Sequence, residues 1–410
     1  MRQYESYKDS GVEWLGEVPS HWELGRISTY FTERRTKVSD KDYPALSVTK
    51  LGVFPQWENV AKTNDGDNRK LAKKGDFVIN SRSDRKGSSG IAKQDGSVSL
   101  INIVLQPKKI NSVYSEYLFK SYSFIEEFYR VGHGIVADLW TTRFEDIKNS
   151  LIIFPPLSEQ QKIAQFLDDK TAKIDQAVDL AEKQIVLLKE HKQILIQNAV
   201  TRGLNPDVPL KDSGVEWIGQ VPEHWGVKKL KFVLTLSNKK EESKNSNKRY
   251  IGMENIESFT GKINDIPLIA EGIANSFYKD EILFGKLRPY LAKSYLADFD
   301  GICSTEFLVY RSTKVLNNRF ALNIFLSYGF IDAVNASTYG SKMPRANAEF
   351  ISNIFLAIPP LLEQKQIIDY LDKQTAKIDQ AIALKTAHIE KLKEYKSVLI
   401  NDVVTGKVRV

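Results

Sequence analysis

The sequence predicts an α+β protein: two α/β domains related by a pseudo-two-fold axis and separated by two long antiparallel coiled-coil helices. Three observations lead to this prediction. Most of the chain is a tandem repeat, each repeat ends in a long heptad pattern, and the segment inside each repeat contains short strand patterns around a basic loop.

Each repeat opens with the same motif and closes with the same motif. "KDSGVEWLGEVPSHW" at 8–22 returns as "KDSGVEWIGQVPEHW" at 211–225, with three of fifteen positions changed. "PPLSEQQKIAQFLDDKTAKIDQA" at 155–177 returns as "PPLLEQKQIIDYLDKQTAKIDQA" at 359–381. Repeats on this scale indicate two copies of one structural unit.

The bodies between these motifs differ much more than the motifs do. "KKGDFVINSRSDRKG" at 73–87 weakly resembles "YKDEILFGKLRPYLA" at 278–292, and "DGSVS" at 95–99 resembles "DGICS" at 300–304. Both pairs favour a β-strand, a basic loop and a further strand. The motifs at the ends and the order of elements are therefore repeated, and we call this the frame. The residues of the body within the frame differ between the two repeats.

The closing motif of each repeat opens a long amphipathic helix. Apolar residues recur at steps of three and four, which is the pattern of a coiled-coil seam. In the first helix these residues are Leu167, Ile174, Val178, Ala181, Ile185, Leu188, Leu195 and Ala199. In the second they are Ile368, Leu371, Ile378, Ile382, Ile389, Leu392, Leu399 and Val403. Each helix has about 45 residues and would be roughly 65 Å long at 1.5 Å per residue. A helix of that length must pack its apolar stripe against another surface, and the other long helix is the simplest partner.

The helix ends carry start and stop signals. Pro155 and Pro156 precede the first helix, Ser158 with Gln161 predicts a capping box, and Gly203 predicts the end. The second helix has Leu362 in place of the serine, and Gly406 can end it.

Three lysines fall on the seams. They are Lys192, Lys385 and Lys396. Lysine at a seam costs stability and helps to fix register, but its side chain more often extends out of the helix pair to solvent, which is the interpretation we favour here. A third interpretation is that this part of the seam faces another protein.

Composition sets the class of protein. The 410 residues are 42% hydrophobic and 27% charged, with a net charge of +7, which indicates a globular chain with a mild bias toward polyanions. No window approaches 18 consecutive apolar residues, and the N-terminal residues lack the apolar stretch of a signal peptide. One cysteine, Cys303, excludes an internal disulfide and fits a cytoplasmic protein.

Catalytic motifs are missing from the sequence. No phosphate-binding glycine motif occurs, and the five histidines lack metal-binding spacing. His21 and His224 occupy equivalent places, where a structural turn before a tryptophan is the favoured interpretation, and Cys303 is interpreted as a small buried residue. "FPPL" and "IPPL" lack the Asp or Asn that precedes Pro-Pro in amino-methyltransferases, so these prolines mark helix starts.

The duplicated motifs resemble a known family. "DSGVEWLGEVPSHWE", "PPLSEQQKIAQFLD" and their second copies, together with "ILFGKLRPYLAK" and "DFDGICSTEFLVYR", are similar to the specificity subunit of type I restriction–modification systems. The resemblance covers essentially the full chain. It implies target-recognition domains at 1–154 and 211–358, conserved helices at 155–203 and 359–410, and a linker at 204–210.

The resemblance also implies a function and partners. A specificity subunit is not an enzyme: each target-recognition domain reads one half of a split site in double-stranded DNA, and the helices set the spacer between the halves. Two methyltransferase subunits dock on it and use S-adenosylmethionine to methylate adenine N6, and restriction subunits that use ATP and Mg²⁺ are optional further partners. No cofactor is then expected in this chain, and no membrane is involved.

Base reading needs polar side chains on a rigid support among cations that contact phosphates. The basic loops supply such residues. The candidates in the first body are Arg82, Ser83, Arg85, Lys86, Trp140, Thr141 and Arg143. The candidates in the second are Lys286, Arg288, Tyr290, Ser341, Lys342, Arg345 and Asn347. Asp84 can accept a hydrogen bond from a cytosine amine or simply pair with Arg82 or Arg85.

The sequence leaves two other functions open. A fused nuclease or methyltransferase would need a cofactor or metal motif, and a coiled-coil adaptor that binds only protein would ignore DNA sequence. If the readers do bind one duplex together, half-site centres about 34 Å apart, one helical turn, are favoured, because both halves then face the same side. The unlike bodies predict an asymmetric site.

Inserting four residues into one long helix should lengthen the unread spacer between the two half-sites, because the helices would act as a ruler. Sites modified by the complex of the variant, mapped genome-wide, measure this directly. A spacer of unchanged length would contradict the ruler.

Overall fold

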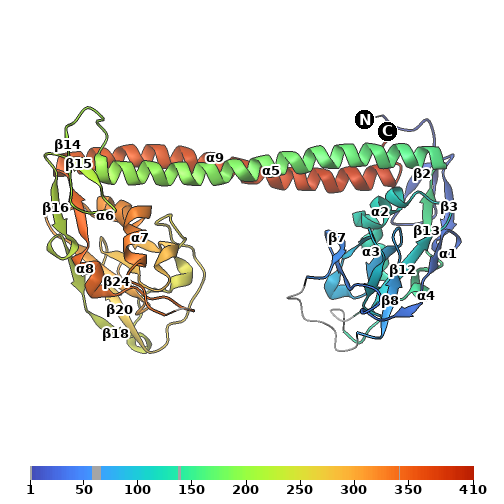
Figure 1. Cartoon of the computed structure of the whole chain (residues 1–410), viewed down its shortest axis with the longest axis horizontal. Coiled ribbons are helices and arrows are strands. Elements are labelled where there is room, and N and C mark those ends of the chain that lie inside the picture. Colours follow the sequence, from blue (N-terminus) through green and yellow to red (C-terminus); the bar gives the residue numbers. More distant parts are fainter. Residues whose placement is uncertain (1, 58–65, 137–139, 341) are drawn as a thin grey trace. The chain divides into compact units, whose positions relative to one another are not determined.

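The computed structural model describes residues 2–57, 66–136, 140–340 and 342–410. Two compact units form the chain: unit 1 comprises Met1–Ala181 with Ala387–Val410, and unit 2 comprises Glu182–Thr386. Each unit therefore contains one reader body and parts of two long helices, α5 (Leu157–Arg202) and α9 (Leu361–Val404) (Figure 1). The mixed helix-and-sheet class predicted from the sequence is confirmed.

Unit 1 begins with an antiparallel hairpin and a strand pair that closes the body. Strands β1 (Tyr7–Asp9) and β2 (Glu17–Pro19) form the hairpin, while β3 (Glu23–Arg26) pairs with β13 (Leu151–Phe154). The segment "EVPSHW" thus reaches the end of the body that leads directly into α5. Residues 27–150 lie between β3 and β13.

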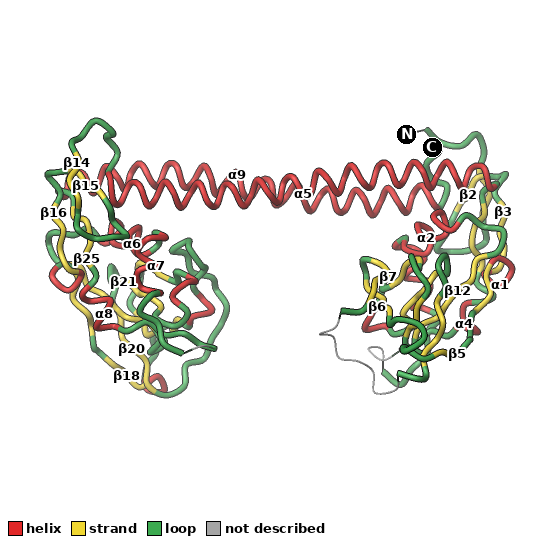
Figure 2. The backbone as a smooth tube through the Cα atoms, in the orientation of Figure 1, coloured by secondary structure: helices red, strands yellow, loops and turns green. Residues whose placement is uncertain are grey.

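Small sheets and short helices fill the body of unit 1 (Figure 2). One sheet has the order β10-β9-β12-β4, a second has the order β11-β8-β5, and β6 pairs with β7. Their bounds are β4 Phe31–Glu33, β5 Lys37–Val38, β6 Leu46–Thr49, β7 Gly52–Pro55, β8 Arg69–Ala72, β9 Phe77–Asn80, β10 Ser89–Ile91, β11 Gly96–Val98 and β12 Asn102–Pro107. The helices are α1 Ile27–Tyr30, the 3₁₀ turn η1 Ser83–Arg85, α2 Ser112–Lys120, α3 Tyr122–Arg130 and α4 Phe144–Ile147.

Unit 2 repeats this architecture. Strand β14 pairs with β15 and β16 with β25, and the sheets have the orders β17-β24-β21-β22 and β18-β20-β23-β19. The strands are β14 Leu210–Asp212, β15 Gln220–Pro222, β16 Gly226–Lys229, β17 Leu234–Ser237, β18 Lys240–Glu242, β19 Tyr250–Ile251, β20 Ile273–Phe277, β21 Ile282–Gly285, β22 Ser294–Leu296, β23 Gly301–Cys303, β24 Phe307–Ser312 and β25 Phe355–Ile358. The helices are α6 Asn318–Phe325, α7 Tyr328–Asn335 and α8 Ala348–Asn353, with 3₁₀ turns η3 Leu230–Phe232, η4 Ser243–Asn245, η5 Met253–Asn255 and η6 Pro289–Leu291.

The predicted pattern of strand, basic loop and strand is confirmed in both bodies. In unit 1 it is β9, η1 and β10, and in unit 2 it is β21, η6 and β22. The "DGSVS" and "DGICS" segments are β11 and β23. The weak internal similarity therefore marked equivalent strands.

The start of each long helix is tied into its unit by a buried glutamine. Gln160, 3% exposed, accepts a hydrogen bond from the Asn111 backbone N–H at 2.8 Å and donates to the Pro155 carbonyl at 2.9 Å. Gln364, fully buried, accepts from the Asn317 N–H at 2.7 Å and donates to the Pro359 carbonyl at 2.8 Å. Because buried amides must be satisfied, these bonds fix where each helix leaves its body.

The predicted capping box at Ser158 and Gln161 is wrong. Helix α5 begins at Leu157, so Ser158 lies inside its first turn, and the Pro156 carbonyl accepts from the N–H groups of Glu159 and Gln160. Gly203, with φ of +74°, follows the last residue of α5 as predicted, and Gly406, with φ of +77°, follows closely after α9.

Within each unit α5 and α9 pack against each other with opposite chain directions. In unit 1 the core joins Leu167 and Ile174 of α5 with Leu399 and Val403 of α9. The predicted seam residues are all buried or half-buried. The buried ones are Leu167, Ile174, Ala181, Ala199, Ile368, Leu371, Ile378, Ile389, Leu399 and Val403, and the half-buried ones are Val178, Ile185, Leu188, Leu195, Ile382 and Leu392.

The seam lysines bind acids or amides of the facing helix. Lys192 Nζ donates to Asp379 Oδ1 at 2.6 Å in unit 2, and Lys396 Nζ donates to the equivalent Asp175 at 2.6 Å in unit 1. Lys385 donates to Gln184 Oε1 at 2.6 Å. The Lys192 side chain is only 12% exposed, so the favoured interpretation of a lysine extending to solvent is wrong for this residue. Both aspartates belong to the repeated "TAKIDQA" segment.

Replacing Asp379 with alanine should lower the free energy of unfolding of the helix pair by about 1–2 kcal/mol, because it leaves the partly buried Lys192 ammonium without its acceptor. The measurement is the urea midpoint followed by helical circular dichroism. Asp369, exposed on the same helix, provides the control Asp369→Ala, which should change little. Adding Lys192→Leu to Asp379→Ala should restore stability. Equal urea midpoints for Asp379→Ala and Asp369→Ala would contradict a stabilising role of the Lys192–Asp379 bond.

Candidate nucleic-acid interface

In unit 1 the basic loop after β9 lies against the segment that precedes α4. The Ser83 N–H donates to the Trp140 carbonyl and the Thr142 N–H donates to the Ser81 carbonyl, both at 2.9 Å. Thr141 forms β-bridges with Arg82 and with His133. The two predicted groups, 82–86 and 140–143, are thus held together by backbone hydrogen bonds although they are distant in sequence.

Most charged side chains of this loop have acidic partners. Arg82 Nε lies 3.0 Å from Asp84 Oδ1, and Lys86 Nζ lies 2.6 Å from Glu126 Oε2. Arg85, 68% exposed, lies 3.7 Å from Asp84. The pairing of Asp84 with these arginines is thereby confirmed. Exposed pairs of this kind contribute little stability and can exchange one partner for a phosphate or a base.

In unit 2 the two equivalent loops are also joined by backbone hydrogen bonds, and we call this contact the junction of unit 2. The Arg288 N–H donates to the Pro344 carbonyl at 2.7 Å, and the Ala346 N–H donates to the Lys286 carbonyl at 2.8 Å. Arg345 bridges to Leu287 and Tyr339 through its backbone. The candidates on the two loops therefore lie together here as well.

Side chains at this second junction divide into engaged and exposed groups. The Arg345 guanidinium binds Glu306 at 3.0–3.1 Å, which raises the pKa of the arginine. Asn347 caps α8, because its Oδ1 accepts from the N–H groups of Glu349 and Phe350. Tyr290 is 46% exposed and Lys342 is exposed, whereas Ser341 lies outside the described residues. The capping role of Asn347 was missed, although Asn before "AEF" is a helix-start signal.

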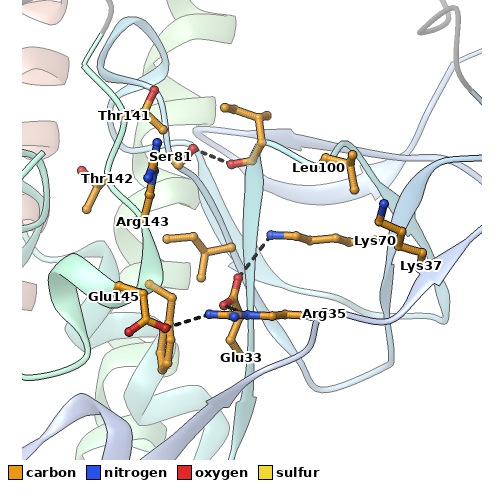
Figure 3. Close-up of a pocket in the computed structure, with 13 residues that line it drawn as sticks. Glu33, Arg35, Lys37, Lys70, Ser81, Leu100, Thr141, Thr142, Arg143 and Glu145 are labelled. Atoms are coloured by element: carbon orange, nitrogen blue, oxygen red, sulfur yellow. Dashed lines mark hydrogen bonds and ion pairs between the residues drawn. The ribbon is translucent and has the colours of Figure 1, made fainter. Parts of the chain in front are cut away.

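Two cavities flank the unit 1 loop. The first, about 620 Å³, we call the basic cavity (Figure 3). Its lining residues are Glu33, Arg35, Lys37, Lys70, Ser81, Leu100, Ile101, Ile103, Thr141, Thr142, Arg143, Phe144 and Glu145. The second, about 650 Å³, contains the amides Gln56, Asn80 and Asn102 beside Asp84 and Arg85. Of these residues, sequence reasoning had identified Thr141, Arg143 and Arg85 as candidates for DNA contact.

A half-buried acid, Glu33, holds two cations of the basic cavity. The Glu33 side chain, 9% exposed, binds Arg35 Nε at 2.5 Å and Lys70 Nζ at 3.2 Å, and Lys70 also donates to the Asn102 carbonyl at 2.7 Å. Glu145 binds Arg35 at 2.9 Å and also pairs with Lys148, which lowers the pKa of the Glu145 carboxyl. Figure 3 shows Arg35 between the two acids. In the sequence, the basic run "RRTKV" at 34–38 is the feature that could have indicated these cavity residues.

The repeated histidines serve the helix starts. His21 Nε2 lies 2.9 Å from Glu159 Oε2, and His224 Nε2 lies 2.8 Å from Glu363 Oε2. Tyr4 also donates to Glu159, at 2.6 Å; burial chiefly, together with this bond, raises the pKa of the tyrosine. The adjacent Trp22 and Trp225 are buried. The predicted turn before each tryptophan is confirmed, because the N–H groups of Trp22 and Trp225 donate to the carbonyls of Pro19 and Pro222.

Among the described residues, no group of three or more His, Cys, Asp or Glu side chains is arranged to hold a metal ion. Within the same ranges, no helix is both long and hydrophobic enough to cross a bilayer.

Comparison with known proteins places the chain in a family. A model of the type I restriction modification DNA specificity domain matches it twice, at residues 20–184 and 222–394. The chain therefore belongs to the family of type I restriction modification DNA specificity domains, each repeat containing one copy.

Individual relatives agree with this assignment. The chain is 27% identical to the type I restriction enzyme EcoDI specificity subunit of Escherichia coli, over 57% of each chain. It is 25% identical to the MjaVIII specificity subunit and 23% identical to the putative MjaX specificity subunit, both of Methanocaldococcus jannaschii. Those alignments cover 96% of this chain and 94% of MjaVIII, and 97% of this chain and 96% of MjaX.

Solved structures share the fold. A chain from a study of complex assembly and conformational transition of the type I R-M system matches with a TM-score of 0.70 and 13% identity, over 95% of this chain and 99% of that one. The HsdS subunit from Thermoanaerobacter tengcongensis matches with a TM-score of 0.56 and 15% identity, over 95% and 98%.

The Cys303 thiol should resist modification in the native protein. The residue is fully buried, and burial raises the pKa of its thiol to about 12, so the reactive thiolate is scarce at pH 8. Titration with a chromogenic disulfide reagent should show no fast-reacting thiol in buffer and one thiol after denaturation. Rapid reaction of the folded chain would contradict the buried assignment.

Proposed function

We propose that this chain is the DNA-reading and scaffolding subunit of a type I restriction–modification complex. One observation carries the proposal: each unit presents two joined loops at the same place on the same frame, and the side chains of those loops differ between units. Each body then reads one half of an asymmetric, bipartite DNA site. The chain itself performs no chemistry.

Partners supply the reaction in this proposal. Two methyltransferase subunits that use S-adenosylmethionine dock on the conserved helices and methylate adenine N6, and restriction subunits that use ATP and Mg²⁺ can join them. Support comes from the family assignment and from the exposed apolar residues on the outer surface of the helices. In α5 these include Val186, Leu187 and Ile194, and in α9 they include Leu384 and Val398.

The direct test is genome-wide mapping of methylated adenines with the gene present and deleted. Loss of one asymmetric split motif on deletion is expected. Methyl transfer by the isolated chain would instead favour an enzyme, and a purified complex that ignores DNA sequence in footprinting would favour a protein-only adaptor.

Exchanging residues 27–150 for the body of another family member should change one half-site and leave the other unchanged. These bounds keep the β3–β13 pair and the start of α5 intact, so the frame is retained. Residues 230–354, between β16 and β25, provide the reciprocal exchange, which should change only the other half. The readout is the methylated motif. A change in both halves from a single exchange would contradict modular reading.

A further inference from the structure

The side chains that line the basic cavity of unit 1 include free hydrogen-bond donors, whereas each carboxylate oxygen there already has a cationic partner. Both oxygens of Glu33 are bound, one by Arg35 and one by Lys70, and both oxygens of Glu145 are bound, one by Arg35 and one by Lys148. Ser81 and Thr142 donate their hydroxyl hydrogens to backbone carbonyls. Each carboxylate oxygen of the cavity therefore already has a cationic partner, which leaves the lining richer in donors than in acceptors.

Among the residues that the structure describes, two cations of the cavity have no side-chain partner. Lys37 and Arg143 line it and are exposed, and within the described ranges neither side chain makes a hydrogen bond or ion pair. In Figure 3 they lie on opposite sides of the cavity, with the engaged Lys70 between them. The net charge of the four cations and two acids is positive. An acceptor-only anion fits this arrangement.

Two counterpart positions in unit 2 lack this charge and one keeps it, because Lys240 lies opposite Asn275 as Lys37 lies opposite Lys70. Strand register places Asn275 where unit 1 has Lys70, and both side chains donate to the carbonyl of the first residue of the neighbouring strand, Phe307 or Asn102. Glu33 lies opposite Leu105 in β12, whereas Leu236 lies opposite the equivalent Tyr310. Asn347, which caps α8, stands where unit 1 has Arg143. Unit 1 thus adds the cations Lys70 and Arg143 to this place, whereas the lysine at the position of Lys37 is common to both units.

We propose that the basic cavity binds the sugar–phosphate backbone of the DNA, with Lys37 and Arg143 each contacting one phosphate. This rests on the proposed DNA-reading function and deepens it. Phosphate oxygens are acceptors only, and cations beside a reading loop fix its register on the duplex without specifying bases. Glu33 acts as a positioning residue, because it holds Arg35 and Lys70 in the cavity wall.

The experiment uses the full chain in its complex with methyltransferase subunits. Affinity is measured for a duplex with the mapped site and for a scrambled duplex, between 50 and 200 mM salt. Lys37→Gln and Arg143→Gln should each weaken binding to both duplexes by the same factor, about tenfold at 0.1 M salt. Each should also reduce the slope of log affinity against log salt by about 0.9. The matched control is Lys108→Gln, which removes one exposed charge just after β12, at the opposite end of that strand from Asn102, and should leave the slope unchanged.

Replacement of single phosphates by neutral methylphosphonate locates the contact. One backbone position should weaken the unmodified complex but not the Lys37→Gln complex, and a second position should behave likewise for Arg143→Gln. A salt slope equal to that of the control, or a loss confined to the mapped site, would overturn the inference while leaving DNA reading intact. Equal binding of both duplexes by the unmodified complex would instead overturn the proposed function.

Discussion

Packing of α5 against α9 is the constraint on which each unit depends. The apolar seam supplies the attraction, but an apolar stripe alone tolerates shifts along the helix axis. The Lys192–Asp379 and Lys396–Asp175 bonds place an equivalent polar contact in each unit, and that contact favours a single register. The seven-residue repeat "TAKIDQA" is explained by this requirement, because it supplies an apolar seam residue and the aspartate side by side in both helices.

Side chains of the repeated motifs also fix the connection between each long helix and its reader body. Gln160 and Gln364 satisfy backbone groups of the body, while Glu159 and Glu363 receive the histidines of the opening motif. The motifs at the two ends of a repeat are therefore conserved within the chain because they meet in space. Between them the chain was free to change, since the strand frame of β9, β12 and β4, or of β21, β24 and β17, is held by backbone hydrogen bonds.

The contrast between Lys70 and Asn275 shows how one frame can present two surfaces. Both side chains fill the same structural role by donating to an equivalent carbonyl, yet only the lysine adds a charge to the adjacent cavity. Likewise the acid near the loop is Glu33 in one unit and Glu306 in the other, and each recruits a different arginine. Specificity in such a protein depends on the donors and acceptors that are left for DNA after the other side chains have bonded within the protein.

The sequence by itself determined the features that depend on local periodicity and internal repetition: the two units, the long helices, the seam, and the strands around the basic loops. It also placed the two candidate loops of each body. Only the tertiary structure decided their pairing, the side chains already engaged, such as Asn347 and Arg345, and the cavity beside Lys37. The physical reason is separation along the chain: Glu33, Lys70 and Glu145 come together through strand pairing and packing across more than a hundred residues, and no local pattern records those contacts.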